Sequence, residues 1–132
     1  MDTVVIRVFP YRQNPEGKFF PVVPLRLNFK AQIIDSSALI DSGATISVFR
    51  SDVAHDLNLK IENGREIYLG GVGGRIKGYI HRLNIEIAGK KFLCPVVFSH
   101  EYTVSFNLLG REAVFKQFRI IFEENKKLLK LE

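Results

Sequence analysis

Residues 38–45 read Ala38-Leu39-Ile40-Asp41-Ser42-Gly43-Ala44-Thr45. The stretch from Ile33 to Ile40 predicts a strand that runs directly into Asp41. A carboxylate, a hydroxyl and a glycine follow the strand directly. The sequence therefore predicts that Asp41 is held at the end of an apolar strand.

The rest of the chain alternates apolar and polar residues in the rhythm of half-buried strands, with turn residues at short intervals. A slip in the apolar phase near His81 and Arg82 predicts a β-bulge. Residues 10–17 are rich in Pro, Asn and Gly and predict a loop. Besides 33–40, we expect strands over residues 4–8, 25–29, 66–69, 76–87, 92–98, 118–122 and 126–131. We therefore expect an all-β fold.

One or two short helices are expected beside these strands. Ser51 is a suitable N-cap for a helix that extends to Leu59. A second helix is expected over residues 111–117, where Ala113 and Val114 supply an apolar face.

Length and composition favour a single domain over residues 1–132, because 46% hydrophobic and 25% charged residues suit one ordinary core. The formal net charge is +5, but Lys and Arg are spread along the chain, so we expect no nucleic-acid partner. No signal peptide and no membrane-spanning segment is recognisable, so we expect no membrane partner. Cys94 is the only cysteine, which excludes an intrachain disulfide and favours a cytoplasmic location.

Three features bear on function, and their order along the chain matters more than any one of them. Asp41-Ser42-Gly43 follows an apolar strand. Gly70-Gly71-Val72-Gly73-Gly74 forms the tip of an expected long hairpin. Leu108-Leu109-Gly110 precedes the expected late helix. Each segment alone is common in turns or strand ends.

Together, the three segments resemble the retropepsins, the single-domain aspartic proteases of retroviruses and their cellular relatives. Residues 38–45 are similar to the catalytic segment, residues 70–77 to the flap, and residues 108–111 to the segment before the C-terminal helix. The similarity covers roughly residues 25–121 and leaves residues 1–20 as an N-terminal extension. It implies a closed barrel, one half of an acid protease, with a flap hairpin.

The resemblance implies a homodimer in which each copy supplies Asp41. Metal-free peptide hydrolysis uses one group to activate water and another to donate a proton, and two carboxylates that share a proton do both. The chain has only one Asp-Ser-Gly, so a two-fold axis near Asp41 must bring in the second carboxylate. By resemblance, Ser42 hydrogen-bonds across this axis, Gly43 lets the backbone turn beneath the substrate, and Ala44 completes the supporting loop.

The same resemblance assigns substrate contacts to the flap and to one pocket wall. Gly71, Val72 and Gly73 would hold the substrate through main-chain amides, and Leu108 would line an apolar specificity pocket. The expected partners are a second copy and a protein or peptide substrate, and no cofactor or metal is expected.

Other interpretations of these residues are weaker. No Gly-Lys-Ser/Thr follows the glycines, so a phosphate loop is disfavoured, and Ser42 has no Gly-x-Ser-x-Gly elbow.

One alternative stays open. Retroviral enzymes carry an acidic residue where this chain has Thr45, so Arg111 lacks its expected partner. A catalytically inactive dimeric module that binds peptides or supports assembly therefore remains the second interpretation. The terminal strands pair either across the dimer or within one subunit.

Overall fold

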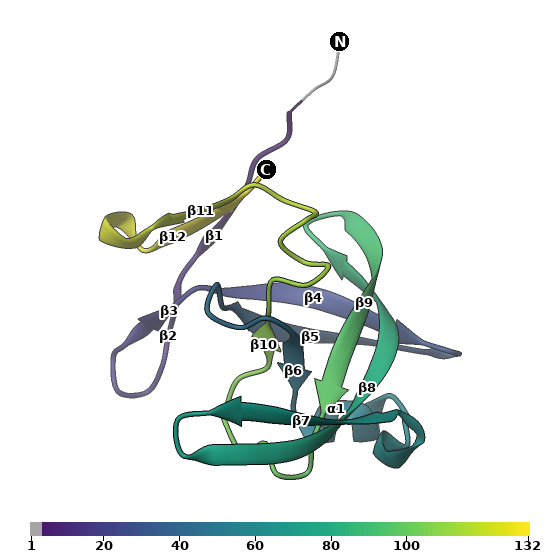
Figure 1. Cartoon of the computed structure of the whole chain (residues 1–132). Coiled ribbons are helices and arrows are strands. Elements are labelled where there is room, and N and C mark those ends of the chain that lie inside the picture. The colour runs from purple at the N-terminus through teal and green to yellow at the C-terminus, as the bar shows by residue number, and fades with distance from the viewer. Residues whose placement is uncertain (1–3) are drawn as a thin grey trace.

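The computed structural model describes residues 4–132 and consists mostly of β-strands (Figure 1). It contains one short α-helix and two short 3₁₀ helices. The elements are β1 (Arg7–Pro10), β2 (Arg12–Gln13), β3 (Phe19–Phe20), β4 (Val22–Phe29), β5 (Gln32–Ile40), β6 (Ser47–Phe49), α1 (Ser51–Asp56), η1 (Ile61–Asn63), β7 (Arg65–Gly71), β8 (Gly74–Ile87), β9 (Lys90–Phe98), β10 (Leu108–Leu109), β11 (Ile120–Glu123), η2 (Glu124–Lys126) and β12 (Leu128–Leu131).

The largest sheet has seven strands in the order β4-β5-β10-β6-β9-β8-β7, and an additional pairing of β4 with β8 closes the barrel. Alternation along β4 explains its two faces: Leu25 and Leu27 are buried, whereas Arg26 and Asn28 point outward. The expected all-β barrel is therefore confirmed. Inside it, side chains from β4, β6, β8 and β9 form one apolar core, with Leu27, Phe49, Leu83, Val96 and Phe98 almost fully buried.

The expected long hairpin is formed by β7 and β8, which pair from Arg65↔Ile80 to Gly71↔Gly74. The expected bulge at His81 and Arg82 is absent: β8 pairs with β9 in unbroken register from Tyr79 to Ile87. The apolar phase changes there because β8 changes neighbours. Its first half forms a two-stranded arm with β7, and its second half covers the core beside β9 and β4.

The helices differ from the expectation. The helix expected over residues 51–59 ends at Asp56, not Leu59, because Asn58 adopts a left-handed conformation with φ of 53°. Its N-cap is Arg50 rather than Ser51, and no side chain caps it. The helix expected over residues 111–117 is absent, and residues 112–117 form consecutive turns. Ala113, with φ of 67°, prevents a regular helix, and the amide of Val114 donates to the carbonyl of Glu112, only two residues back, at 2.8 Å.

The terminal strands pair within one subunit, in a separate sheet of order β1-β12-β11. The expected loop over 10–17 contains part of a small hairpin made by β2 and β3. The first strand begins at Arg7, so Val4 and Ile6 lie outside it. Residues 1–3 of the expected N-terminal extension lie outside the described residues. Figure 1 places this sheet and the β7–β8 hairpin at opposite ends of the molecule.

Candidate active site

Asp41 stands where two parallel strands end side by side. β5 and β10 pair in parallel through Leu39↔Leu108 and Ile40↔Leu109. The next main-chain amide, that of Asp41, donates to the carbonyl oxygen of Leu109 at 3.0 Å. The first and third sequence features thus lie in direct contact, and this contact fixes where the Asp41 backbone leaves the sheet.

The loop after Asp41 is a tight turn built on the Asp41 side chain itself. The amide of Gly43 donates to Asp41 Oδ1 at 2.9 Å, and the amide of Ala44 donates to the Asp41 carbonyl at 3.2 Å. Asparagine and aspartate favour such turns because their side chains accept from the backbone two residues on. Asp41 is half-buried, while Ser42 and Gly43 are exposed. The outer face of this loop is therefore open to a partner or a substrate.

Residues 110–112 support the loop after Asp41 through main-chain hydrogen bonds and close packing. The amides of Arg111 and Glu112 donate to the carbonyls of Ala44 and Thr45, each at 2.9 Å. Gly110 packs so closely that an added Cβ would lie 2.5 Å from the carbonyl carbon of Ile46. Its amide donates to the buried Ser47 hydroxyl at 3.0 Å. Glycine is required here for a close approach of two backbones.

Arg111 lacks a carboxylate partner among the described residues. Its guanidinium lies 3.5 Å from the Thr45 hydroxyl. A neutral hydroxyl at this distance is a weak contact compared with an ion pair. The main-chain bonds of residues 111 and 112 therefore position the loop without the acidic residue that the resemblance called for.

The flap tip is exposed and turns through glycine. Gly73 and Gly74 have φ of 97° and 122°, a region that side chains other than glycine rarely adopt. Gly71, Val72 and Gly73 are all solvent-exposed, and Val72 is fully so. The β7–β8 hairpin therefore ends in an exposed glycine turn.

A cavity of about 400 Å³ lies between the β7–β8 hairpin, β6 and residues 101–104, and no residue of the Asp41 loop lines it. The flap contributes Leu69, Val72 and Ile76 to it, and β6 contributes Val48. Residues 101–104 form its remaining wall. Leu108, the predicted pocket residue, is half-buried in β10 and pairs with Val48 rather than lining this cavity. No sequence pattern distinguished Val48 or Ile76, because cavity and core positions show the same alternation.

Tyr102 is another residue that sequence reasoning missed. Its hydroxyl donates to the carbonyl of Phe106 at 2.6 Å. Burial and, to a smaller extent, the Asp41 carboxylate raise the pKa of Tyr102 to about 12, while Arg50 acts in the opposite direction. Tyr102 therefore lies within electrostatic reach of Asp41. Sixty-one residues separate the two along the chain, so no local pattern could have paired them.

The base of the flap is attached to the segment that carries Tyr102. The Ser99 hydroxyl donates to the carbonyl of Lys77 and accepts from the amide of Glu101 at 3.1 Å. The amide of Lys77 in turn donates to the Glu101 carboxylate. Ser99 is fully buried. These bonds give the flap a fixed base beneath its exposed tip.

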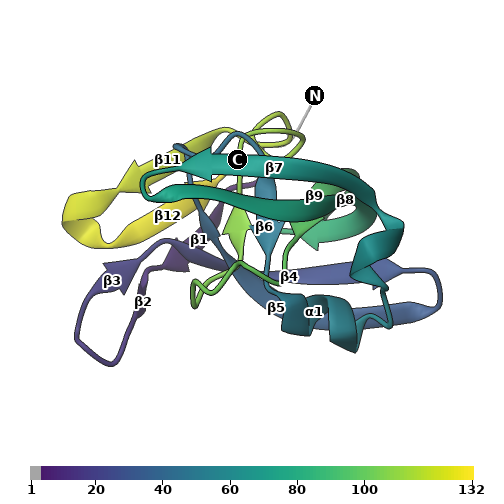
Figure 2. The same cartoon turned by 60° about the horizontal axis from the view of Figure 1, so that its bottom comes forward.

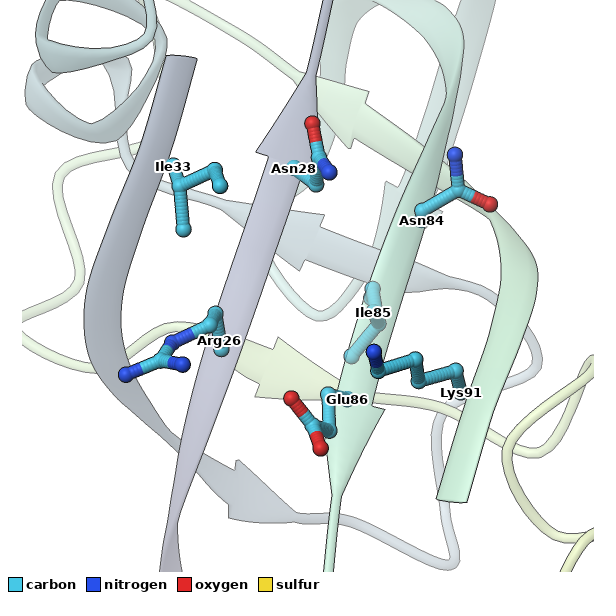
Figure 3. A pocket seen from close by; sticks show the side chains of 7 residues that line it. All are labelled: Arg26, Asn28, Ile33, Asn84, Ile85, Glu86 and Lys91. Carbon is cyan, nitrogen blue, oxygen red and sulfur yellow. The ribbon is translucent and has the colours of Figure 1, made fainter. Parts of the chain in front are cut away.

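A different pocket of about 260 Å³ lies on the outer face of the barrel (Figure 3). Its side chains come from β4, β5, β8 and β9, all from outward positions except the buried Ile85, and Arg26 pairs with Asp35 at 2.9 Å. No residue of the catalytic loop or the flap tip lines it. The lining residues are Arg26, Asn28, Ile33, Asn84, Ile85, Glu86 and Lys91.

Across residues 4–132, no three His, Cys, Asp or Glu side chains are grouped so that they could hold a metal ion. Within the same residues, no helix is long and apolar enough to cross a membrane.

The aspartyl protease family matches residues 23–113, which include the catalytic loop, the flap and the Leu-Leu-Gly segment. None of the curated proteins matches the chain in sequence. A solved retropepsin-like aspartic protease from Rickettsia conorii has a TM-score of 0.71 at 18% identity, over 96% of this chain and 91% of that chain. EIAV protease, solved with the inhibitor HBY-793, has a TM-score of 0.55 at 22% identity, over 70% of this chain and 82% of that chain.

These two likenesses concern the fold alone, whereas the family match covers most of the chain. The chain belongs to the aspartyl protease family and has a retropepsin-like fold. The resemblance read from the three sequence segments is thereby confirmed.

Proposed function

We propose that two copies of this chain form an aspartic endopeptidase that cuts extended protein or peptide segments, with one Asp41 from each copy. The observation that carries this proposal is the half-buried Asp41, held at the end of two strands and oriented by its own tight turn. A single carboxylate cannot both activate water and donate a proton, so the site is complete only with a second copy.

In the proposed reaction, the two Asp41 carboxyls share one proton. The ionised carboxylate takes a proton from water while the water oxygen attacks the substrate carbonyl carbon. The protonated carboxyl donates its proton to the carbonyl oxygen. Proton transfer to the amide nitrogen then lets the carbon–nitrogen bond break. Because the two groups titrate as a pair, their pH dependence should follow two macroscopic pKa values.

The surrounding residues have supporting roles in this proposal. Ser42 is exposed at the turn and is available to hydrogen-bond across the axis, while Gly43 and Ala44 keep the turn compact. Amides of Gly71, Val72 and Gly73 at the open flap tip would bind the substrate backbone and exclude water. Val48, Leu69 and Ile76 line the cavity beneath the flap, which favours substrates with apolar side chains near the cut bond.

The test is hydrolysis of a mixed peptide library by the wild type and by Asp41→Asn, between mildly acidic and neutral pH. Asp41→Asn keeps the size of the side chain and its acceptor for the Gly43 amide, so the fold should survive. We expect cleavage to disappear while sedimentation equilibrium shows unchanged dimerisation. Equal cleavage by both proteins would remove Asp41 from the mechanism.

A second function rests on one observation, the absence of a carboxylate beside Arg111 among the described residues. A dimer that binds peptides without cutting them would keep the cavity beneath the flap, but it would not require a precisely ordered loop after Asp41. It predicts that wild type and Asp41→Asn bind library peptides equally and that neither releases fragments.

A further inference from the structure

The terminal sheet has only two edges at which another chain could add a strand. β12 is the middle strand of the order β1-β12-β11, so its main-chain groups pair with its own chain on both sides. β1 and β11 are the edge strands. Edge strands present unpaired N–H and C=O groups and readily pair with another chain unless something prevents it.

The main chain of β11 alternates between β12 and the open edge. The main chains of Arg119 and Glu132 exchange two hydrogen bonds, of 2.9 and 3.0 Å, so these residues form a hydrogen-bonded pair at the end of the β11–β12 ladder. Two residues further on, Ile121 faces β12 in the same way. The N–H and C=O groups of Ile120 and Phe122 consequently point to the edge, where no strand of residues 4–132 pairs with them.

The edge of β1 is protected by a proline. The Tyr11 amide donates to the Lys127 carbonyl at 2.8 Å, so Phe9 also faces β12, whereas Val8 and Pro10 face outward. Pro10 has no N–H to offer. Val8 is thus the single outward donor of β1, and proline at such a place is a common means of preventing edge pairing. β11 has no such protection.

We propose that β11 pairs antiparallel with β11 of a second copy, across a two-fold axis at Ile121, and that the two terminal sheets become one sheet of six strands. The inference rests on the proposed homodimer and adds the surface by which it forms. Ile120 lies opposite Phe122 of the partner subunit, and both have outward main-chain groups. The two exchange two hydrogen bonds, and the symmetric pair exchanges two more.

The charges of residues 119–123, Arg-Ile-Ile-Phe-Glu, select this register. Arg119, whose side chain is 74% exposed, lies opposite Glu123 of the partner subunit, and the reverse pair follows by symmetry. Moving the axis to Ile120 or Phe122 would set one of these charges opposite Ile121. Within its own chain, Arg119 lies 3.8 Å from Glu132, and Glu123 contacts Lys126 and Lys130. Positive and negative side chains therefore alternate across the proposed contact.

Apolar side chains also match across the proposed axis. Phe9, Leu129 and Phe122 form one cross-strand row on the core side of the sheet. Leu129 is fully buried, but Phe122, at the end of the row, is 39% exposed. Ile120 of the partner subunit would cover Phe122 and continue the row.

The position of β11 fits an axis that also passes the catalytic loops. Residues 111 and 112 bond to the loop after Asp41, and β11 begins eight residues after Glu112. Figure 2 shows β11 as the outer strand of its sheet, on the same side of the molecule as the flap tip. For the proposed active site, the same axis must bring two Asp41 residues together as well as two β11 strands.

A cysteine at the axis tests the register. Ile121 would face Ile121 of the partner subunit in a pair without hydrogen bonds, about 4.5 Å apart between Cα atoms, which suits a disulfide. Ile121→Cys should therefore form a covalent dimer under mild oxidation. Cys94 is buried and should not react. The matched control is Val8→Cys, on the outward side of β1, which should stay monomeric on a non-reducing gel.

Proline substitution tests the main-chain contact separately. Phe122→Pro removes an outward N–H without touching the bonds to β12, and it should raise the dimer dissociation constant about tenfold or more, because two interchain bonds disappear per dimer. Phe122→Leu, which keeps the N–H, separates the loss of the ring from the loss of the donor. Val8→Pro should leave the dissociation constant unchanged.

The outcomes separate this inference from the proposed function. A dimer that cleaves peptides but resists cross-linking through Ile121→Cys, or that weakens with Val8→Pro and not with Phe122→Pro, would overturn the β11 contact and leave the protease intact. Efficient cross-linking without Asp41-dependent cleavage would support the contact and remove the enzyme. A chain that sediments as a monomer at every concentration would overturn both.

Discussion

At position 110 only glycine fits, because the backbone there passes very close to the backbone of Ile46. An added Cβ would lie 2.5 Å from the Ile46 carbonyl carbon and 2.6 Å from its oxygen. Gly110→Ala should cost about 1–3 kcal/mol of unfolding free energy, measured in urea, because two backbones must separate. Since the displaced segment positions Asp41, peptide cleavage should fall about 100-fold.

The matched control is Gly70→Ala in the flap, where an added Cβ would meet no atom within 4 Å. We expect its stability to stay within about 0.5 kcal/mol of the wild type. If Gly110→Ala is equally neutral, the two backbones are not in the close contact described.

Cys94 gives a pH dependence whose sign follows from burial. Burial raises the pKa of this thiol from 9.0 to about 11, although the Ser47 hydroxyl acts in the opposite direction. The folded chain thus keeps a proton that the unfolded chain releases above pH 9. The thiol's contribution is complete below pH 9 and is lost as the pH rises toward 11, by up to about 1.4 kcal/mol per pH unit.

This predicts that urea unfolding between pH 9 and 10.5 reduces the stability of the wild type faster than that of Cys94→Ala. The substitution leaves a cavity and lowers stability at every pH, so the slope is the quantity to compare. Parallel slopes would mean that the thiol is accessible to solvent.

At the scale of elements, the flap depends on its base. The buried Ser99 hydroxyl joins Lys77 of β8 to the segment that carries Glu101. Ser99→Ala leaves the Lys77 carbonyl and the Glu101 amide without this partner, and we expect a loss of about 1–3 kcal/mol. Amide hydrogen exchange should speed up across β7 and the first half of β8, while β4 and β5 stay protected.

Ser105→Ala is the control for that experiment, because Ser105 is exposed. It should leave exchange in the flap unchanged. Faster exchange throughout the barrel in Ser99→Ala would instead show that the hydroxyl supports the whole core and not the flap.

At the scale of the whole molecule, the proposed shared site makes activity depend on both chains of a dimer. Asp41→Asn chains should still dimerise, so they should inhibit the wild type by forming mixed dimers with one carboxylate. With dimers saturated and a ninefold excess of Asp41→Asn, about one tenth of the wild-type activity should remain, since partners pair at random. The measurement is the initial rate of peptide cleavage after the mixture has exchanged subunits.

An excess of Asp35→Asn provides the comparison. Asp35 lies on the outer face and pairs with Arg26, so its dimers should be active and the rate should rise. Inhibition by both variants alike would indicate competition for substrate rather than mixed dimers.

Most strands, the flap tip and the position of Asp41 could be predicted from the sequence, because they depend on local chemistry. Alternation identified most of the strands, glycine identified the flap tip, and Asp41 stood at the end of a strand because its neighbours are apolar and a turn follows. These features depend on residues a few positions apart, which is the range over which a sequence pattern acts.

Only the tertiary structure decided the remainder, because it depends on contacts between distant residues. Ala113 breaks the predicted late helix where residues 111 and 112 bond to the Asp41 loop. Tyr102 and Val48 reach the site from separate segments, and β12 takes a strand of its own chain on each side. Periodicity names a strand and its buried face, but pairing is set by the free energy of the whole packed sheet, which no short segment contains.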